Sequence, residues 1–414
     1  MNGREGHPAI DPLILFGAFD RHNFGDLLLG ETARALVAPR PVVLAGLAAR
    51  DMSAFGGEQV VSIAALARES ANRPAEILYV GGELLTCSLY EAAVMLQSDD
   101  AASRILSRHD SDPETNHAWA ASMLGINQPI AYQVPRNFFP CRRFVGYLGV
   151  GGVDMARLRP EAGAQVLAQI AAADSVWVRD RTTWRHLENH RVQTMLAPDP
   201  AELTAVLFRS EIESRAAGGE PMAVRERYPH GYLAVQFSAD FGDDATLDVI
   251  GDGLQKIQQE YELGLVLFRA GSAPWHDRLD VFGRLLERTP GLDAVVFHSL
   301  HLWDLCALLA GCRGYAGSSL HGRIVAGAFG KPAASLASAA ISTSKVGIYV
   351  SSWCPRAMRT VARPETLADA IRCSLQLQRV ERLRSDRLAA LAGTAANACR
   401  RALGLEPLPA AASI

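Results

Sequence analysis

The stretch GYAGSSLHGR, residues 314–323, decides the fold of the second half of the chain. A short apolar strand, 314–317, ends at two hydroxyl-bearing residues, and a helix of small residues begins at once. A strand that runs directly into a helix is the unit of a parallel α/β sheet, in which ligands bind beyond the carboxyl ends of the strands. His321 then lies in the first helical turn, where free backbone N–H groups favour anions and an imidazole can exchange protons near neutral pH.

The same order of elements recurs outward from this stretch along most of the chain. Short apolar runs are followed by turns rich in Gly, Asn or Asp and then by amphipathic segments. This repetition predicts an α/β protein of two Rossmann-like lobes with parallel sheets, which is a GT-B-like fold. The expected strands are Leu13–Phe19, Val42–Leu47, Ile77–Val80, Ile130–Val134, Val145–Leu148, Ser175–Val178, Tyr232–Phe237, Gly264–Phe268, Ala294–Phe297, Gly314–Gly317 and Ala333–Leu336.

The boundary between the lobes is expected in a hydrophilic stretch that contains Gly218, Gly219 and Pro221. We therefore expect an N-terminal lobe over 1–212, a linker over 213–229 and a C-terminal lobe over 230–364. A segment rich in Ala, Leu and Arg predicts C-terminal helices over 365–405 that pack back across both lobes. The last residues, 406–414, are expected to be a flexible tail.

Composition excludes several classes of protein. The 414 residues are 49% hydrophobic and 21% charged with a net charge of -3, which is typical of a globular enzyme and disfavours nucleic-acid binding. The 7 cysteines form no CxxC pair and are expected to be reduced thiols. Residues 1–12 lack a signal peptide's apolar core, and no stretch reaches the ~18 apolar residues of a membrane span. The sequence therefore predicts a cytoplasmic protein.

A second informative turn is GAFDRHNFGD, residues 17–26, which lies between an apolar strand and a leucine-rich helix. Gly17 and Gly25 permit a close backbone approach, while Asn23 and Asp26 can cap the helix. Such a turn can hold an anion or orient a sugar hydroxyl, although an ordinary helix cap would use the same residues.

Three further turns follow strands of the first half. Gly81 and Gly82 precede Glu83, and the run 149–152 is GVGG. Arg179 and Asp180 end the strand 175–178, where Arg179 can reach an anion or simply pair with a carboxylate. Asp199, between two prolines, is open to the same two interpretations.

No cofactor or metal is expected. Neither glycine pair has the GxGxxG spacing of a dinucleotide site. His298, His301 and Asp304 have a helix-like spacing that could suit a metal site, but the sequence indicates no fourth ligand.

Taken in chain order, these turns resemble the polysaccharide pyruvyl transferase family. The resemblance runs from Gly17-x5-Asn23-x-Gly25-Asp26, through the Gly-Gly turns and Val178-Arg179-Asp180, to Ser318-Ser319-Leu320-His321-Gly322 and Gly330-Lys331-Pro332. It implies a GT-B-like transferase that moves the enolpyruvyl group of phosphoenolpyruvate onto two sugar hydroxyls as a cyclic ketal. The implied acceptor is a saccharide or lipid-linked precursor in exopolysaccharide or cell-envelope glycan synthesis, and it would bring the protein to a membrane surface.

The resemblance also implies roles for residues. His321 matches the family's histidine and is the expected proton-transfer group. Donor-binding residues are expected among Ser318, Ser319, Leu320, Gly322, Arg323, Arg179 and Arg269. Acceptor-binding residues are expected in the opposing lobe, at Asn23, Gly25, Asp26, Gly81 and Gly82.

One departure from the family's pattern concerns the donor. Many members carry an arginine immediately before the Leu-His pair, whereas this chain has Ser319. Either Arg323 supplies that charge from the next helical turn, or the donor differs from phosphoenolpyruvate. A glycosyltransferase that uses a nucleotide sugar, and a non-catalytic sugar-binding protein, are the two alternatives on the same fold.

Overall fold

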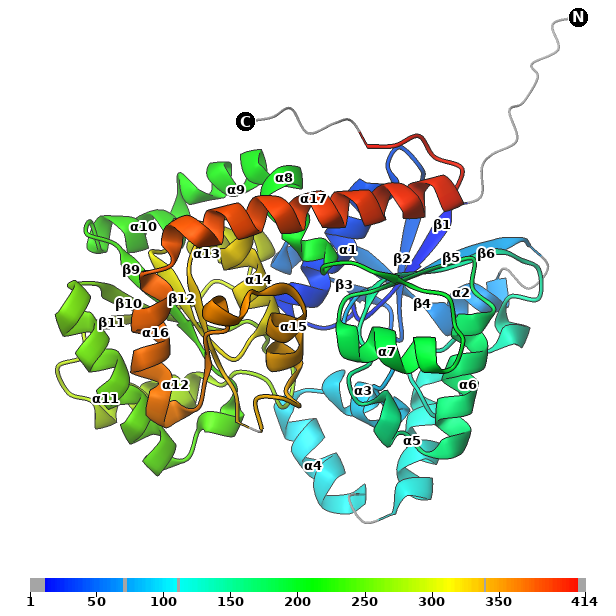
Figure 1. The fold of residues 1–414 in the computed structure, drawn as a ribbon. Coiled ribbons are helices and arrows are strands. Elements are labelled where there is room, and N and C mark those ends of the chain that lie inside the picture. Colours follow the sequence, from blue (N-terminus) through cyan, green and yellow to red (C-terminus); the bar gives the residue numbers. More distant parts are fainter. Residues whose placement is uncertain (1–11, 70–72, 110–111, 339, 409–414) are drawn as a thin grey trace, which may run out of the picture.

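The computed structural model describes residues 12–69, 73–109, 112–338 and 340–408. Within them the chain forms two lobes, each built on one sheet with helices on its faces (Figure 1). The expected tail 406–414 falls mostly outside the described residues, as do residues 1–11.

The first sheet has the strand order β3-β4-β2-β1-β5-β6-β7-β8, and every neighbouring pair is parallel except β3 with β4. The central pairs are in direct register, for example Leu15 beside Leu78. Its strands are β1 (Leu13–Phe16), β2 (Val42–Gly46), β3 (Arg50–Asp51), β4 (Gln59–Ser62), β5 (Ala75–Val80), β6 (Arg142–Val150), β7 (Ser175–Val178) and β8 (Met195–Leu196).

The second sheet has the order β11-β10-β9-β12-β13-β14 and is parallel throughout. Its strands are β9 (Tyr232–Gln236), β10 (Gly264–Phe268), β11 (Ala294–Phe297), β12 (Gly314–Gly317), β13 (Ala333–Leu336) and β14 (Val361–Ala362). Most of these strands are buried along their whole length, as parallel strands covered on both faces must be.

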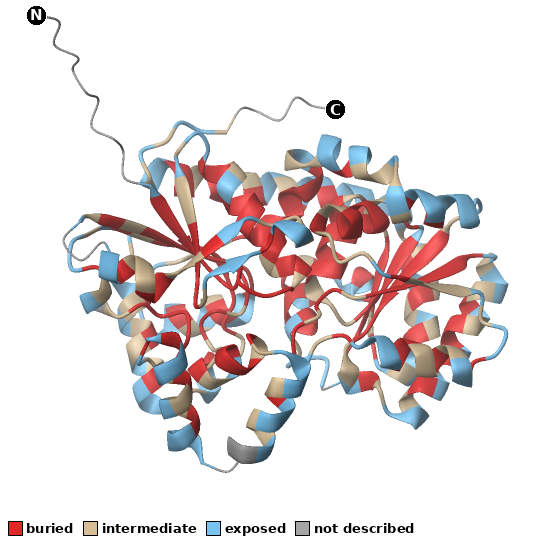
Figure 2. Cartoon of the chain, turned by 180° about the vertical axis from the view of Figure 1, so that it is seen from behind, coloured by how far each residue is buried: buried red, intermediate tan, exposed pale blue. Residues whose placement is uncertain are grey.

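Helices cover both faces of each sheet, and Figure 2 shows buried residues concentrated in the sheets and in the helices between the lobes. The helices are α1 (Phe24–Val37), α2 (Ile63–Glu69), α3 (Leu89–Met95), α4 (Asp99–His109), α5 (Pro113–Leu124), α6 (Pro160–Ala171), α7 (Arg181–Asn189), α8 (Thr204–Leu207), α9 (Arg209–Ala216), α10 (Gly219–Arg227), α11 (Asp244–Tyr261), α12 (Leu279–Arg288), α13 (Leu302–Gly311), α14 (Leu320–Ala328), α15 (Lys345–Trp353), α16 (Leu367–Leu375) and α17 (Gln378–Ala402). None of the described helices is long and apolar enough to cross a membrane.

The C-terminal helix α17 joins the two lobes (Figure 1). At its start Ser385 donates a hydrogen bond to the carbonyl of Ala328, on α14 of the second lobe. Near its end Arg400 donates to the carbonyl of Leu36, on α1 of the first lobe. The prediction of two parallel-sheet lobes bridged by C-terminal helices is therefore confirmed.

Two local expectations differ from the structure. Residues 130–134 are buried but form no strand, because Val134 donates to the Tyr79 hydroxyl and the segment packs under the sheet instead of joining its ladder. The stretch expected as a linker is mostly helical, since α9 and α10 occupy it. Arg215 of α9 pairs with Asp304 at 2.7 Å, so these helices pack on the second lobe.

Candidate active site

A cleft of about 820 Å³ lies between the lobes. Its wall is built from segments that directly follow the carboxyl ends of parallel strands in both sheets, as expected for ligand sites of this architecture. From the first lobe these segments follow β1, β5, β6 and β7. From the second they follow β9, β10, β12 and β13. Predicted site residues on the wall are Asn23, Asp26, Gly82, Arg179, Ser318, Ser319, Leu320 and His321.

His321 lies in the first turn of α14 and is 9% exposed. Its Nε2 lies 3.6 Å from Asp199 Oδ2, within ion-pair range but beyond hydrogen-bond length. No described residue makes a hydrogen bond of ordinary length with this nitrogen, which is buried beside the Asp199 carboxylate. A proton on Nε2 would be stabilised by the neighbouring carboxylate.

Asp199 joins His321 to a buried arginine. Its Oδ2 accepts a hydrogen bond from Arg179 at 3.0 Å, and Arg179 also donates to Glu83 at 3.1 Å. Burial alone would raise the pKa of Asp199, but His321, Arg179 and the Ala201 N–H outweigh it and leave the pKa below its ordinary value. Asp199 is therefore ionised and can counter a charged imidazole.

The glycine turn 149–152 makes room for this cluster. A Cβ at Gly151 would lie 2.6 Å from Glu83 Oε2 and 2.8 Å from Arg179 Nε. A side chain here would displace the carboxylate and the guanidinium. The glycine therefore serves the close approach of the protein's own charged groups.

The first-lobe motif meets His321 directly. A Cβ on Gly25 would lie only 1.9 Å from His321 Nδ1, so no residue with a side chain fits opposite the imidazole. Asn23 caps α1 by accepting from the N–H groups of Gly25 and Asp26, and its Nδ2 lies 3.2 Å from His276 Nε2. Phe24 donates its N–H to the carbonyl of Ala270 in the other lobe. The turn 17–26 thus holds the lobes together around the histidine.

Arg21 and Asp26 give the first-lobe wall its charge. Arg21 donates to the Tyr132 hydroxyl at 2.6 Å and lies 3.7 Å from Asp26. Both side chains are largely buried yet line the cleft, so they can orient the hydroxyls of a polar ligand.

The second-lobe wall contains a buried amide–carboxyl network. Gln236 donates to both oxygens of Asp277, at 2.8 and 2.9 Å, and accepts from the Ser319 N–H at 2.8 Å. Burial raises the pKa of Asp277 to about 7. Ser318 accepts from the N–H of Ser238, while Ser319 caps α14 by accepting from Gly322. The two serines therefore shape the turn that presents His321.

Some predicted residues do not face the cleft. The expectation for Arg323 is wrong, because its guanidinium is buried and donates to Ala333 O, Ser335 Oγ and Thr360 O inside the second lobe. Arg269 and Gly322 are outside the cleft lining. Gly81, at φ 54°, is a packing turn, since a Cβ there would meet Leu29 at 2.4 Å.

Other wall residues were not singled out from the sequence, among them Glu83, Arg21, Asp277 and Lys345. Glu83 and Arg21 lie inside quoted turns, so their position after a strand was an available signal. Asp277 and Lys345 have no local motif, and only the convergence of strand ends brings them to the cleft.

No cluster of three His, Cys, Asp or Glu side chains suited to a metal occurs among the described residues. Asp304, which together with His298 and His301 had suggested a metal site, instead accepts hydrogen bonds from Arg215 and Ser299.

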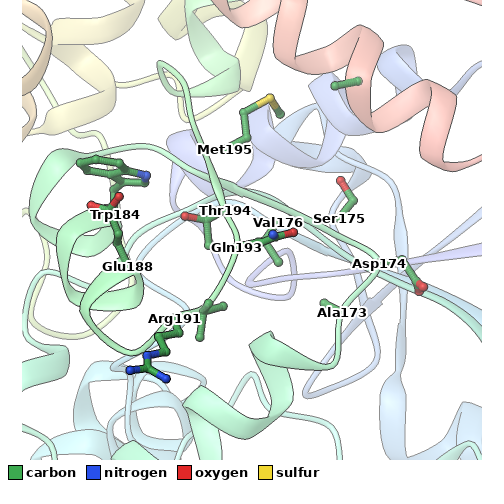
Figure 3. A pocket seen from close by; sticks show the side chains of 12 residues that line it. Ala173, Asp174, Ser175, Val176, Trp184, Glu188, Arg191, Gln193, Thr194 and Met195 are labelled. Atoms are coloured by element: carbon green, nitrogen blue, oxygen red, sulfur yellow. The ribbon is translucent and has the colours of Figure 1, made fainter.

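A second hollow, of about 670 Å³, lies where β7 and β8 begin, at the opposite end of the sheet from the cleft (Figure 3). Trp184, Glu188 and Arg191 surround it, and it contains none of the predicted site residues.

The segment that contains His321 matches a known protein family. Residues 159–339 match the family model described as polysaccharide pyruvyl transferase, which confirms the resemblance over this segment. The matched range includes Arg179, Asp199 and the turn 318–322, whereas the first-lobe motif 17–26 lies before it. No curated protein matches the sequence.

Solved structures share the fold of the whole chain. A UDP-GlcNAc 2-epimerase from Neisseria meningitidis, bound to UDP-GlcNAc, is 10% identical, with a TM-score of 0.53 over 94% of this chain and 98% of that one. A putative UDP-N-acetylglucosamine 2-epimerase from Listeria monocytogenes is 11% identical, with a TM-score of 0.52 over 95% and 96%. At these identities the likeness concerns the fold alone, which is GT-B-like as predicted.

Proposed function

We propose that the protein transfers the enolpyruvyl group of phosphoenolpyruvate to two hydroxyls of a saccharide, giving a cyclic ketal and phosphate. The observation that carries this proposal is the cluster of His321 and Arg179, which line the cleft, with Asp199 buried between them, all within the segment that matches polysaccharide pyruvyl transferases. The cluster combines a group that can carry a proton with a carboxylate that stabilises it in the charged form.

The reaction has defined requirements. The donor's methylene carbon gains a proton and becomes a methyl group, while the adjacent carbon forms C–O bonds to both acceptor oxygens. The C–O bond to phosphate breaks and the phosphate leaves with the electron pair. Of the two hydroxyl protons, one balances the proton gained by the methyl group and the other leaves on phosphate.

His321 is the proton-transfer group in this proposal. Its side chain lines the cleft, and its Nε2 lies 3.6 Å from the Asp199 carboxylate. A positively charged imidazole at the start of α14 would also attract an anionic donor, and the dipole at the helix N-terminus adds to this attraction. The donor is therefore placed against the second lobe.

The acceptor is placed against the first lobe in this proposal. Asp26 and Asn23 lie on that wall together with Arg21, and a carboxylate beside a guanidinium can orient neighbouring sugar hydroxyls. The acceptor would be a saccharide or lipid-linked precursor of an exopolysaccharide or cell-envelope glycan, modified in the cytoplasm.

Phosphate release tests the proposal. Purified protein is incubated with phosphoenolpyruvate and a panel of saccharide acceptors, and released phosphate is measured. We expect release only when donor and acceptor are both present. His321→Ala should abolish it, while His186→Ala, a partly exposed histidine on α7, should not.

The same assay separates the alternatives. Nucleotide release from a nucleotide sugar, with no phosphate release from phosphoenolpyruvate, would favour a glycosyltransferase and contradict the proposal. Saccharide binding without turnover of either donor would favour a binding protein.

A further inference from the structure

The cleft lacks a cation where many pyruvyl transferases have an arginine, because Ser319 occupies that position. Arg323 cannot replace it, since its guanidinium is used inside the second lobe. An anionic donor needs a counter-charge at this wall, and the question is which residue supplies it.

The arginines on the cleft wall already have carboxylate partners. Arg179 lies 3.0 Å from Asp199 and 3.1 Å from Glu83. Arg21 lies 3.7 Å from Asp26. Arg157 lies 3.0 Å from Asp154. Their charges are therefore largely neutralised before a ligand arrives.

Lys345 is the exception on this wall. It is exposed, lines the cleft, and makes no ion pair or hydrogen bond with any other residue that the structure describes. Burial lowers the pKa of His276, which lines the same cleft, and the charges of Arg21 and Lys345 lower it further. Lys345 therefore contributes an unpaired positive charge to the cleft wall.

The backbone around Lys345 also favours an anion. Lys345 is the first residue of α15, whose cap Ser344 accepts only the Gly347 N–H. The first turn of α14 lies on the same wall, with Ser344, Lys345, Ser319 and His321 all lining the cleft. Two helix N-termini thus line one cleft, and the first N–H groups of a helix have no partner within the helix itself.

His321 belongs to the same wall and already has a carboxylate neighbour. His321 Nε2 is buried and has no hydrogen-bond partner among the described side chains and backbone. The Asp199 carboxylate lies 3.6 Å from it, so a charge on this imidazole is countered within the protein, as the arginine charges are, and Lys345 keeps the unpaired positive charge on this wall.

We infer that Lys345, with the first turns of α14 and α15, binds an oxyanion of the donor and supplies the charge that Ser319 cannot. This inference rests on the proposed function for the donor's identity. The shared chemistry is that of a carboxylate or a phosphate, and the two are separated below.

The chain offers an unusually clean test, because Lys256, Lys331 and Lys345 are its only lysines. The intact protein is treated with a lysine-selective acylating reagent, and the labelling rate of each lysine is followed by peptide mass spectrometry. The reaction is repeated with phosphoenolpyruvate, inorganic phosphate or pyruvate. Lys256, exposed on the outer helix α11, is the matched control.

We expect phosphoenolpyruvate to slow acylation of Lys345 at least fivefold and to leave Lys256 unchanged. Protection by phosphate alone assigns the site to the donor's phosphate, and protection by pyruvate alone assigns it to the carboxylate. Equal labelling of Lys345 with and without all three compounds would overturn the inference. So would equal slowing of all three lysines.

Variants check the role of the charge. Lys345→Gln should weaken phosphoenolpyruvate binding about tenfold, Lys345→Arg should restore most of it, and Lys256→Gln should change nothing. Unaltered binding in Lys345→Gln would contradict the inference. Protection of Lys345 without ketal formation would leave the anion site standing and refute the proposed function. Ketal formation without protection would do the reverse.

Discussion

Asp199 and Glu202 lie at the same short helix after β8, yet they belong to different ionic clusters. Asp199 is buried behind the cleft wall, where it contacts two residues that line the cleft, Arg179 and His321. Glu202 lies beneath α17, where it accepts a hydrogen bond from Tyr349 at 2.9 Å and lies 3.6 Å from Arg384. Both carboxyls are almost fully buried.

Their environments move the two pKa values in opposite directions. Burial raises the pKa of Glu202 to about 7, and repulsion from Glu381 and Asp199 adds to this despite the opposing charge of Arg384. For Asp199 the effect of burial is outweighed by His321, Arg179 and a backbone N–H, and its pKa falls. Burial alone therefore does not decide which carboxyl is ready for chemistry.

The difference lies in what each cluster leaves open. The cleft cluster ends at His321, whose side chain lines the cleft. The other is covered by α17, where Arg384 also pairs with Glu381. We interpret the first as a site for a ligand and the second as a structural joint between α17 and the lobes.

The largest expected effect on stability comes from Arg384. Arg384→Ala leaves Glu202 and Glu381 buried without their cation, which should lower the free energy of unfolding by about 3 kcal/mol. Phosphate release per folded molecule should stay unchanged, because the residue lies outside the cleft lining. Denaturant unfolding measures the change, with the exposed Arg387→Ala on the same helix as control. A loss of turnover without a loss of stability would show that Arg384 serves the reaction and not the joint between α17 and the lobes.

Asp199→Asn should have the next largest effect, and on turnover. The amide keeps the shape and can still cap the following helix, but it no longer stabilises a charged imidazole. We expect phosphate release to fall about a hundredfold. Thermal unfolding of the same sample shows whether the fold is intact. Wild-type turnover in a folded Asp199→Asn variant would remove this residue from the mechanism.

Glu202→Gln should have the smallest effect, visible in the pH dependence of stability. The folded-state pKa of about 7 lies above the ordinary value of 4.5, so between these values the folded protein holds a proton that the unfolded chain has lost. Glu202 therefore makes stability fall as pH rises through this window. Glu202→Gln should flatten part of that fall in unfolding experiments across the window. An unchanged slope would show that Glu202 does not titrate as described.

The sequence predicted the strands best where apolar runs stop at glycine or polar turns. Ser175–Val178 and Gly264–Phe268 are observed with the predicted bounds. Residues 130–134 have the same apolar character but are a buried loop. An apolar run indicates burial, and hydrogen bonding to a neighbouring strand is a separate property.

The site was predicted in part for the same reason. His321 and Arg179 follow strands and could be found from their turns. The burial of Arg323 depends on Thr360 and Ser335, which are distant in sequence, and no local pattern reports such contacts. Lys345 reaches the cleft because the segment after β13 returns to it.

The most direct test of the central claim follows the proton assigned to His321. The reaction is run in D₂O with phosphoenolpyruvate and an accepted saccharide, and the product's methyl group is examined by NMR. The account predicts one deuterium in the ketal methyl group made by the wild-type protein and no ketal from folded His321→Ala. Ketal formed by His321→Ala at the wild-type rate, or a methyl group without deuterium, would contradict it.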